Sequence, residues 1–433
     1  MIFISVTLIN LKINTVRFYF VQHYLSRRVL LLAVFWLMWN TLPVCAQDFT
    51  VTGNHCKAVI PFRLVRNMVV VQLQINQHGP YNFILDTGCG LMIITDPKLL
   101  DSLSLKYKKK IKVLGLGEGN DLDAWLVPGL KLQLKGVENN QISAAILAKD
   151  VFDLSSYAGM PIHGLIGYDF FNSFPVKINF ADSTLTAFNL RKSPSYKRTT
   201  KIPLLVEDKK PYLQAQVNFD DRPASTEKLL VDLGAGHPLS LENGWNNCGE
   251  KPDKFIAAAN LGVGLSGPIN GFMGRVQAME IGSYQFAKVV TAFPDSSSAM
   301  DKMANISRDG SIGTDLLKRF VIWFDYRQGF IYLKPNSNIK QPFEHDMSGI
   351  EYYAVGNNFS RIIVCRVEPG SAADLTGIEK NDEILAINFK KVGHMTLQEI
   401  DEIFRSKNDR TLLLEVMRDQ SIAKVLLTLK RRI

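Results

Sequence analysis

The sequence predicts a mainly β protein, in which two pseudo-symmetric β lobes are followed by a smaller α+β domain. Three observations support this fold class. Many short segments alternate apolar and polar residues, as half-buried strands do. One arrangement of residues occurs twice at the same spacing, which indicates an internal repeat. Long helical periodicity is scarce before residue 390. A chain of 433 residues is also too long for one hydrophobic core, so we expect two to three domains.

Residues 1–46 are predicted to be a signal peptide. Arg27 and Arg28 precede an apolar run at residues 29–39, and the sequence before Gln47 fits the small-residue pattern of a cleavage site. The run is short for a membrane span, which needs about 20 apolar residues. An uncleaved membrane anchor is the alternative, and it would associate the chain with a membrane.

The charge and the cysteine content argue against several classes of function. The formal net charge is +9, and residues 1–46 contain four basic and no acidic residues, which leaves +5 for the rest of the chain. This excess is too small for the length to indicate nucleic-acid binding. The five cysteines include no CxxC pair, and the histidines show no ligand spacing. We therefore predict no metal and no cofactor.

The repeat is centred on two aspartates. The segment "PYNFILDTGCG" places Asp86 after an apolar run, and "EKLLVDLGAG" places Asp232 after another. An Ile-Gly-x-Asp segment follows each of them, with its glycine, Gly167 or Gly313, 81 residues after the aspartate. Both motifs occur twice, and the spacing between them is the same in the two copies. This indicates duplication of a lobe of about 145 residues.

Strands dominate the prediction within each lobe. Residues 69–75 and 213–219 alternate apolar and polar side chains, which is the period of a half-buried strand. Glycine-rich segments at residues 114–120 and 261–267 follow the two aspartates at similar distances. Such segments are typical of hairpin turns.

Four short segments carry a resemblance to a known family. They are Asp86-Thr87-Gly88, Leu165-Ile166-Gly167, Asp232-Leu233-Gly234 and Ser311-Ile312-Gly313. Around them, the repeats resemble the lobes of aspartic proteases, especially the small retropepsin-like kind of exported bacterial proteins. The resemblance covers about residues 60–335 and implies one lobe at residues 47–195 and a second at 196–340.

The resemblance also implies roles for individual residues. Asp86 and Asp232 would form a catalytic dyad, and a flexible hairpin would fold over the cleft. Two adjacent carboxyl groups share a proton, so that one can act as a base on water while the other donates to the scissile carbonyl oxygen. The loop-support residues are Thr87, Gly88 and Gly234, and the flap candidates are Gly115, Gly117 and Gly119.

Leu233 departs from the family pattern, which has Thr or Ser there to crosslink the two loops. A leucine side chain cannot form those hydrogen bonds. Three outcomes stay open: an asymmetric working dyad, a weakened enzyme, or a second lobe that serves only as scaffold.

The two Asp segments also have other interpretations. Asp86 could simply cap a turn, and residues 231–236 resemble a phosphate loop of actin-like ATPases. We expect a monomer with an internal pseudo-dimer; pairing of two chains through lobe one is the alternative.

The C-terminal residues 345–433 resemble a PDZ domain. The resemblance is carried by residues 367–388, with Pro-Gly-Ser-Ala, then Gly-Ile, then Asp-x-Ile-Leu-x-Ile-Asn. It implies a groove that binds a peptide by strand addition, with Gly349 and Ile350 in the loop that holds the carboxylate. A PDZ fold that serves only for packing is the alternative. An amphipathic helix with a capping box at Thr396 is predicted within this region.

Together these features predict an exported aspartic-type endopeptidase of the bacterial periplasm or cell envelope, whose PDZ domain binds peptide segments of a peptide or protein substrate. The alternative, which Leu233 keeps open, is a catalytically weak or inactive peptide-binding or scaffold protein.

Overall fold

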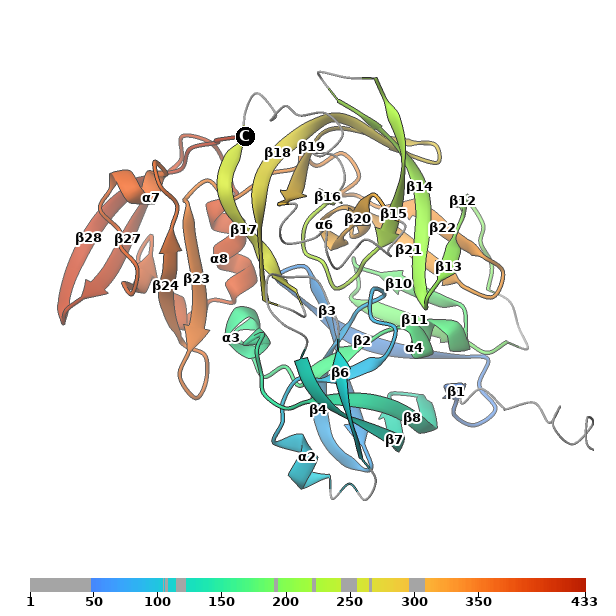
Figure 1. Cartoon of the computed structure of the whole chain (residues 1–433). Coiled ribbons are helices and arrows are strands. Elements are labelled where there is room, and N and C mark those ends of the chain that lie inside the picture. The colour runs from blue at the N-terminus through green and yellow to red at the C-terminus, as the bar shows by residue number, and fades with distance from the viewer. Residues whose placement is uncertain are drawn as a thin grey trace, which may run out of the picture. The chain divides into compact units, whose positions relative to one another are not determined.

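The computed structural model is mainly β, which confirms the predicted fold class (Figure 1). The described residues are 48–103, 105, 108–113, 122–190, 194–219, 223–242, 255–264, 267–295 and 308–433. The predicted signal peptide lies outside them, and among them no helix is long and apolar enough to cross a membrane.

Lobe one is built from strands on both sides of the first Asp loop. Its strands are β1 (Thr50–Val51), β2 (Lys57–Val65), β3 (Met68–Ile75), β4 (His78–Leu85), β5 (Met92–Ile94), β6 (Lys109–Val113), β7 (Leu122–Leu134), β8 (Val137–Leu147) and β9 (Gly164–Ile166); its helices are α2 (Leu99–Ser102), α3 (Leu154–Ala158) and α4 (Tyr168–Ser173). The predicted alternation holds in β3, where exposed Gln72 and Gln74 alternate with buried Leu73 and Ile75.

Lobe two repeats this arrangement. Its elements are β13 (Leu205–Glu207), β14 (Lys210–Asn218), β15 (Ser225–Val231), β16 (Leu239–Leu241), β17 (Ile256–Gly264), β18 (Gly267–Ile281), β19 (Tyr284–Pro294), β20 (Gly310–Ile312) and α6 (Thr314–Leu317). In lobe one β4 pairs parallel with β9, and in lobe two β15 pairs parallel with β20. The neighbouring pairs β5–β9 and β16–β20 are both antiparallel. The equal pairings show the two lobes to be pseudo-symmetric.

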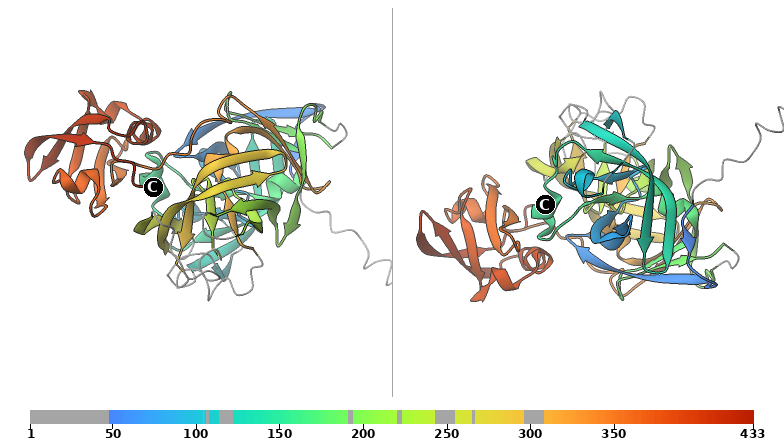
Figure 2. Two further views of the ribbon diagram at one scale, coloured as in Figure 1. Left: turned by 90° about the horizontal axis from the view of Figure 1, so that it is seen from above. Right: turned by 90° about the horizontal axis from the view of Figure 1, so that it is seen from below.

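A central sheet joins the lobes. Its strands run in the order β12-β22-β21-β10-β11-β2 and continue into lobe one. The junction is the antiparallel pair of β10 and β21, in which Val176 lies opposite Phe324. One hydrophobic core extends across both lobes. Figure 2 shows the lobes from two further directions. The additional strands are β10 (Val176–Asn179), β11 (Thr184–Phe188), β12 (Thr200–Pro203), β21 (Phe320–Asp325) and β22 (Phe330–Pro335).

The C-terminal domain has a sheet and a core of its own. The sheet runs β23-β24-β25-β27-β28, so β23 is an edge strand. The predicted helix is α8, and Thr396 and Glu399 form its capping box. Ile400 and Phe404 of α8 are fully buried in the separate core. The elements are β23 (Ile350–Val355), β24 (Arg361–Val367), α7 (Ala372–Leu375), β25 (Glu383–Ile387), β26 (Lys390–Lys391), η1 (Val392–His394), α8 (Leu397–Phe404), β27 (Thr411–Arg418) and β28 (Ser421–Thr428).

Candidate active site

Each Asp loop is fixed by the same backbone hydrogen bonds. Asp86 directly follows β4, and Asp232 directly follows β15. The backbone N–H of each aspartate donates to the last carbonyl of the neighbouring strand, β9 at 2.8 Å or β20 at 2.9 Å. Each carboxylate accepts from the backbone N–H two residues later, from Gly88 at 2.7 Å and from Gly234 at 2.8 Å. The repeat in the sequence therefore produces two loops of the same geometry.

The two loops face each other. A Cβ atom added to Gly234 would lie 2.5 Å from Cγ of Asp86, and one added to Gly88 would lie 3.3 Å from Oδ2 of Asp232. The first distance is shorter than any side chain tolerates, so residue 234 must be glycine for the loop to approach the opposite carboxyl group. The structure thus brings the carboxyl groups of Asp86 and Asp232 close to each other.

Burial and the second carboxyl group favour the protonated form of Asp86. Burial raises its pKa well above the ordinary range, and the charge of Asp232 raises it further. The N–H of Gly88 stabilises the carboxylate and opposes this shift. Two carboxyl groups that lie close to each other in a buried site cannot both ionise readily. A pair of this kind therefore shares one proton.

The hydrogen bonds that crosslink the two Asp loops come from a side chain of the first loop, Thr87. Oγ1 of Thr87 donates to the Val231 carbonyl at 2.5 Å and accepts from the Leu233 N–H at 2.9 Å. The Leu233 side chain is fully buried in the core, and its carbonyl accepts from Oγ1 of Thr314 at 3.1 Å. The second loop therefore has a packed apolar side chain where the first has a hydroxyl, and the Thr87 hydroxyl bonds to the opposite loop on both sides of Asp232.

A hairpin turn from lobe one supports the Asp232 loop. The turn joins β2 to β3, and Asn67 donates from Nδ2 to the Gly236 carbonyl at 3.0 Å and to Oδ1 of Asp315 at 3.2 Å. Lys318 donates to Oδ1 of Asn67 at 2.9 Å and pairs with Asp315 at 2.7 Å. These contacts tie the lobes together next to the site, and no motif in the sequence pointed to Asn67.

The matching turn of lobe two lies on the Asp86 loop. It joins β13 to β14, and a Cβ added to Gly90 would lie 3.3 Å from Cβ of Lys209. The Lys209 ammonium lies 5.6 Å from the centre of the Tyr168 ring, at the start of α4. Each lobe thus braces the Asp loop of the other. A signal was available in the sequence, because each turn lies just before one of the two strands that the alternation predicts, at residues 69–75 and 213–219.

Charge interactions connect two further side chains, His237 and Tyr326, with the two aspartates. Nε2 of His237 lies 3.0 Å from Oγ of Ser311, and burial lowers the pKa of His237. The Tyr326 ring stacks on Phe171 at 5.7 Å, and its hydroxyl has no hydrogen-bond partner among the described residues. Burial raises the pKa of Tyr326, and the negative charge of Asp86 adds to the shift.

The other predicted site residues are the flap candidates and the loop of the PDZ domain. Gly115, Gly117 and Gly119 fall in residues 114–121, between the paired strands β6 and β7, and lie outside the described residues. Gly349 and Ile350 lie in the C-terminal domain, where Gly349 donates its N–H to Oδ1 of Asp346 at 2.7 Å and Ile350 donates to Oγ of Ser348 at 3.1 Å. In this conformation both N–H groups are therefore engaged within the loop.

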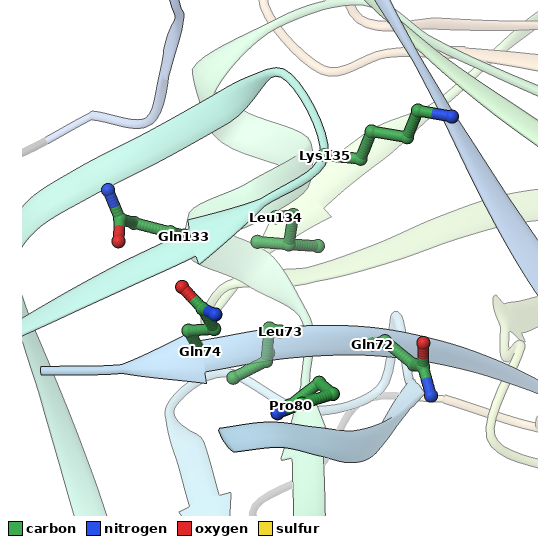
Figure 3. Close-up of a pocket in the computed structure, with 7 residues that line it drawn as sticks. All are labelled: Gln72, Leu73, Gln74, Pro80, Gln133, Leu134 and Lys135. Carbon is green, nitrogen blue, oxygen red and sulfur yellow. The ribbon is translucent and has the colours of Figure 1, made fainter. Parts of the chain in front are cut away.

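Two further observations concern the part of the chain that the structure describes. No group of three or more potential metal-ligating side chains occurs within those residues. A surface pocket between β3, β4 and β7 contains no residue of either Asp loop (Figure 3). Its lining residues are Gln72, Leu73, Gln74, Pro80, Gln133, Leu134 and Lys135.

Comparisons with known families agree with this geometry. Residues 71–170 match the family model described as aspartyl protease, and residues 339–417 match that of the PDZ domain. The chain contains an aspartyl protease domain and a C-terminal PDZ domain. The aspartyl protease match includes the Asp86 loop and Gly167, whereas the Asp232 loop lies outside both matches.

Solved structures and curated proteins give more distant comparisons. The crystal structure of an aspartic proteinase from Irpex lacteus is similar over 66% of this chain and 99% of that chain, with 12% identity and a TM-score of 0.41. A photosystem II D1 C-terminal processing protease is similar over 19% of this chain and 22% of its own, with 17% identity and a TM-score of 0.18. No curated protein matches the chain.

Proposed function

We propose that this protein is an aspartic-type endopeptidase in which Asp86 and Asp232 activate water against a peptide bond. The observation that supports this most is the meeting of two equivalent Asp-x-Gly loops, which places the two carboxyl groups close to each other. Such a pair provides a base and an acid at one place, which is what hydrolysis of an amide by water needs.

In the proposed reaction the pair begins with one proton, which Asp86 carries because its pKa is raised. Asp232 takes a proton from a water molecule, whose oxygen bonds to the scissile carbonyl carbon. Asp86 gives its proton to the carbonyl oxygen, so a neutral tetrahedral diol forms. Asp232 then returns its proton to the amide nitrogen, the C–N bond breaks, and Asp86 regains a proton from a diol hydroxyl. No covalent enzyme intermediate forms.

The loop residues would keep the two carboxyl groups in place during these transfers. The N–H groups of Gly88 and Gly234 each hold one oxygen of the neighbouring aspartate. Thr87 ties its own loop to the backbone on both sides of Asp232. Fixed donors of this kind need no reorganisation as charge moves, which is a main source of catalysis.

A second candidate function is peptide binding without catalysis. Leu233 favours it, because the second loop lacks the hydroxyl of the family, and the aspartyl protease match ends before lobe two. In that case the PDZ domain would carry the activity, and the lobes would serve as scaffold.

A cleavage assay tests the proposal. The protein from Gln47 onward is mixed with a peptide library at pH values from acid to neutral, and cleavage is measured. Asp86→Asn and Asp232→Asn are compared with Asp101→Asn, which changes an exposed aspartate of α2. We expect cleavage by the unmodified and Asp101→Asn proteins and none by the two dyad variants. Loss in Asp86→Asn alone would make lobe two a scaffold and indicate pairing of lobe one between chains. No cleavage by the folded unmodified protein at any pH would favour the peptide-binding function.

The remaining features of the proposal concern place and partners. We propose that residues 1–46 direct export to the periplasm or cell envelope of a bacterium, and that the mature chain is a monomer with an internal pseudo-dimer. We also propose that the PDZ domain binds extended peptide segments of the substrate. N-terminal sequencing of the exported protein and its mass in solution test the first two points.

A further inference from the structure

The peptide-binding edge of the PDZ domain can be located from its own contacts. PDZ domains bind an extended peptide as an added strand at a sheet edge, and β23 ends this sheet. Helix α8 packs beside β23, because the Tyr352 hydroxyl donates to Asp401 at 2.5 Å and the Tyr352 ring meets Phe404 at 5.9 Å. The space between β23 and α8 is therefore where a peptide would lie.

A segment of lobe one already occupies this space. Gly159 directly follows α3, and a Cβ added to it would lie 3.0 Å from Cδ1 of Leu397 on α8 and 3.6 Å from Cβ of Ala354 on β23. Its φ of +66° is one that glycine adopts without strain. The end of α3 thus contacts both walls of the groove.

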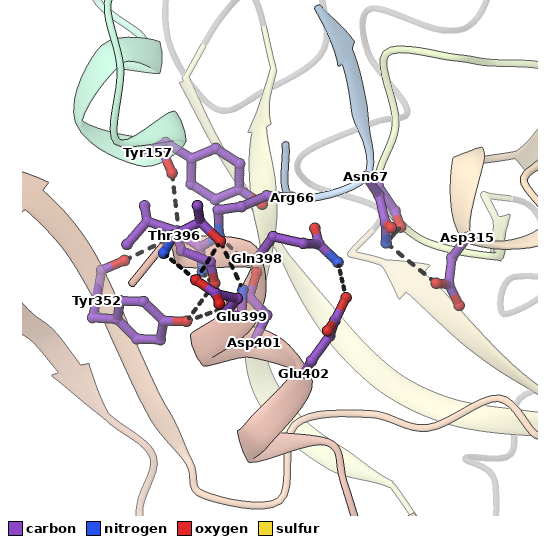
Figure 4. A network of polar contacts seen from close by, with 12 residues as sticks. Arg66, Asn67, Tyr157, Asp315, Tyr352, Thr396, Gln398, Glu399, Asp401 and Glu402 are labelled. Carbon is purple, nitrogen blue, oxygen red and sulfur yellow. Dashed lines mark hydrogen bonds and ion pairs between the residues drawn. The ribbon is translucent and has the colours of Figure 1, made fainter. Parts of the chain in front are cut away.

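Arg66 fastens lobe one to the same groove. Its guanidinium pairs with both carboxylate oxygens of Asp401 at 3.0 Å and donates to the carbonyl of Tyr352 in β23 at 3.2 Å. It also lies between two aromatic rings, 4.4 Å from the centre of Tyr157 and 4.8 Å from that of Tyr352 (Figure 4). The side chains of Arg66 and Asp401 are only 11% and 13% exposed. A bidentate, largely desolvated ion pair of this kind is specific in geometry as well as strong.

The loop that would hold the carboxylate of a bound peptide, at Gly349 and Ile350, also has its N–H groups occupied. The Asp346 carboxylate accepts from Gly349 and Ser348, and Ser348 in turn accepts from Ile350. An internal carboxylate thus uses an N–H group that a ligand carboxylate would need.

We infer that the PDZ domain is self-inhibited, with lobe one in its peptide groove and the Arg66–Asp401 pair as the latch. A peptide binds along β23 only when Arg66 and α3 withdraw from it. The apparent affinity for peptide is then the intrinsic affinity reduced by the fraction of open molecules, so removal of the latch raises it. The inference rests on the proposed peptide binding by the PDZ domain and does not depend on proteolysis.

The test measures binding of a fluorescein-labelled pool of short peptides with free C-termini, in chains that carry Asp86→Asn to prevent cleavage. Arg66→Ala and Asp401→Ala open the latch from its two sides. Their matched controls are Arg63→Ala, at an exposed arginine of β2, and Glu402→Ala, at an exposed glutamate of α8. We expect at least about tenfold tighter binding in both latch variants and no change in the controls. Thermal unfolding of each variant checks that it is folded.

Amide hydrogen exchange provides a second readout. We expect faster exchange at residues 350–355 of β23 in both latch variants, since the groove is then open to solvent. Equal affinity in all variants, or tighter binding in only one of the latch variants, would overturn the inference. Tighter binding in the latch variants, together with no cleavage by the folded unmodified chain, would refute the proposed protease and leave the latch supported.

Discussion

Replacement of Thr87 by valine measures how much the one-sided crosslink holds the two lobes together. The change keeps the branched shape and removes one hydroxyl, which leaves the Val231 carbonyl and the Leu233 N–H without their side-chain partner. Thr87 is fully buried, so water cannot easily replace the lost hydrogen bonds. An unpaired buried group costs about 1–3 kcal/mol, so for these two groups we expect a loss of about 2–6 kcal/mol in the free energy of unfolding.

Thr95 offers a matched control in the same lobe. It is also fully buried, but its hydroxyl has no hydrogen-bond partner among the described residues. Thr95→Val therefore removes an unsatisfied polar atom and should change the free energy of unfolding by less than about 0.5 kcal/mol, or increase it. Thr87→Ser, which restores the hydroxyl, should recover most of the loss.

Urea unfolding followed by tryptophan fluorescence compares the three variants with the unmodified chain, and cleavage assays show whether the dyad survives. We expect Thr87→Val to lower cleavage as well, because the backbone on both sides of Asp232 loses its anchor. If Thr87→Val were no more harmful than Thr95→Val, the reasoning that one threonine replaces the two hydroxyls of the family would be wrong.

Three further predictions concern the dyad and the PDZ loop. Gly234→Ala should reduce cleavage at least about 100-fold, because its Cβ would meet Cγ of Asp86 at 2.5 Å, whereas Gly236→Ala, whose nearest atom would be 3.4 Å away, should be much milder. The kcat/KM of the unmodified enzyme should fall as pH rises through the raised pKa of Asp86, since the acid form is then lost, and a pH profile that rises there would contradict this assignment. Burial raises the pKa of Asp346 to about 6, so the folded state binds this proton more tightly than the unfolded state does. The free energy of unfolding should therefore fall by up to about 3 kcal/mol from about pH 4 to about pH 6 and then level off. In Asp346→Asn this contribution should be absent, and equal pH curves for the two proteins would refute it.

The sequence determined much of this protein because its informative patterns are local. The alternation of apolar and polar residues in β3 follows from the two-residue period of a strand, and the capping box at Thr396 and Glu399 lies within one helical turn. The two Asp-x-Gly motifs recur at one spacing, so the lobes and the aspartates at their centres could be predicted before any contact was known.

Only the tertiary structure decided how the parts meet. Asn67 reaches Gly236 and Asp315 across the lobe boundary, and Arg66, the preceding residue of the same turn, reaches Asp401 of the PDZ domain. Both residues lie in a two-residue hairpin turn with positive φ angles, 46° for Arg66 and 63° for Asn67. A turn of this kind is defined by its own backbone, and nothing in its local sequence tells which distant surface it will contact. The same holds for Leu233: the sequence shows a missing hydroxyl, but its burial, and the hydrogen bonds that Thr87 makes in its place, depend on how two loops from distant parts of the chain pack together.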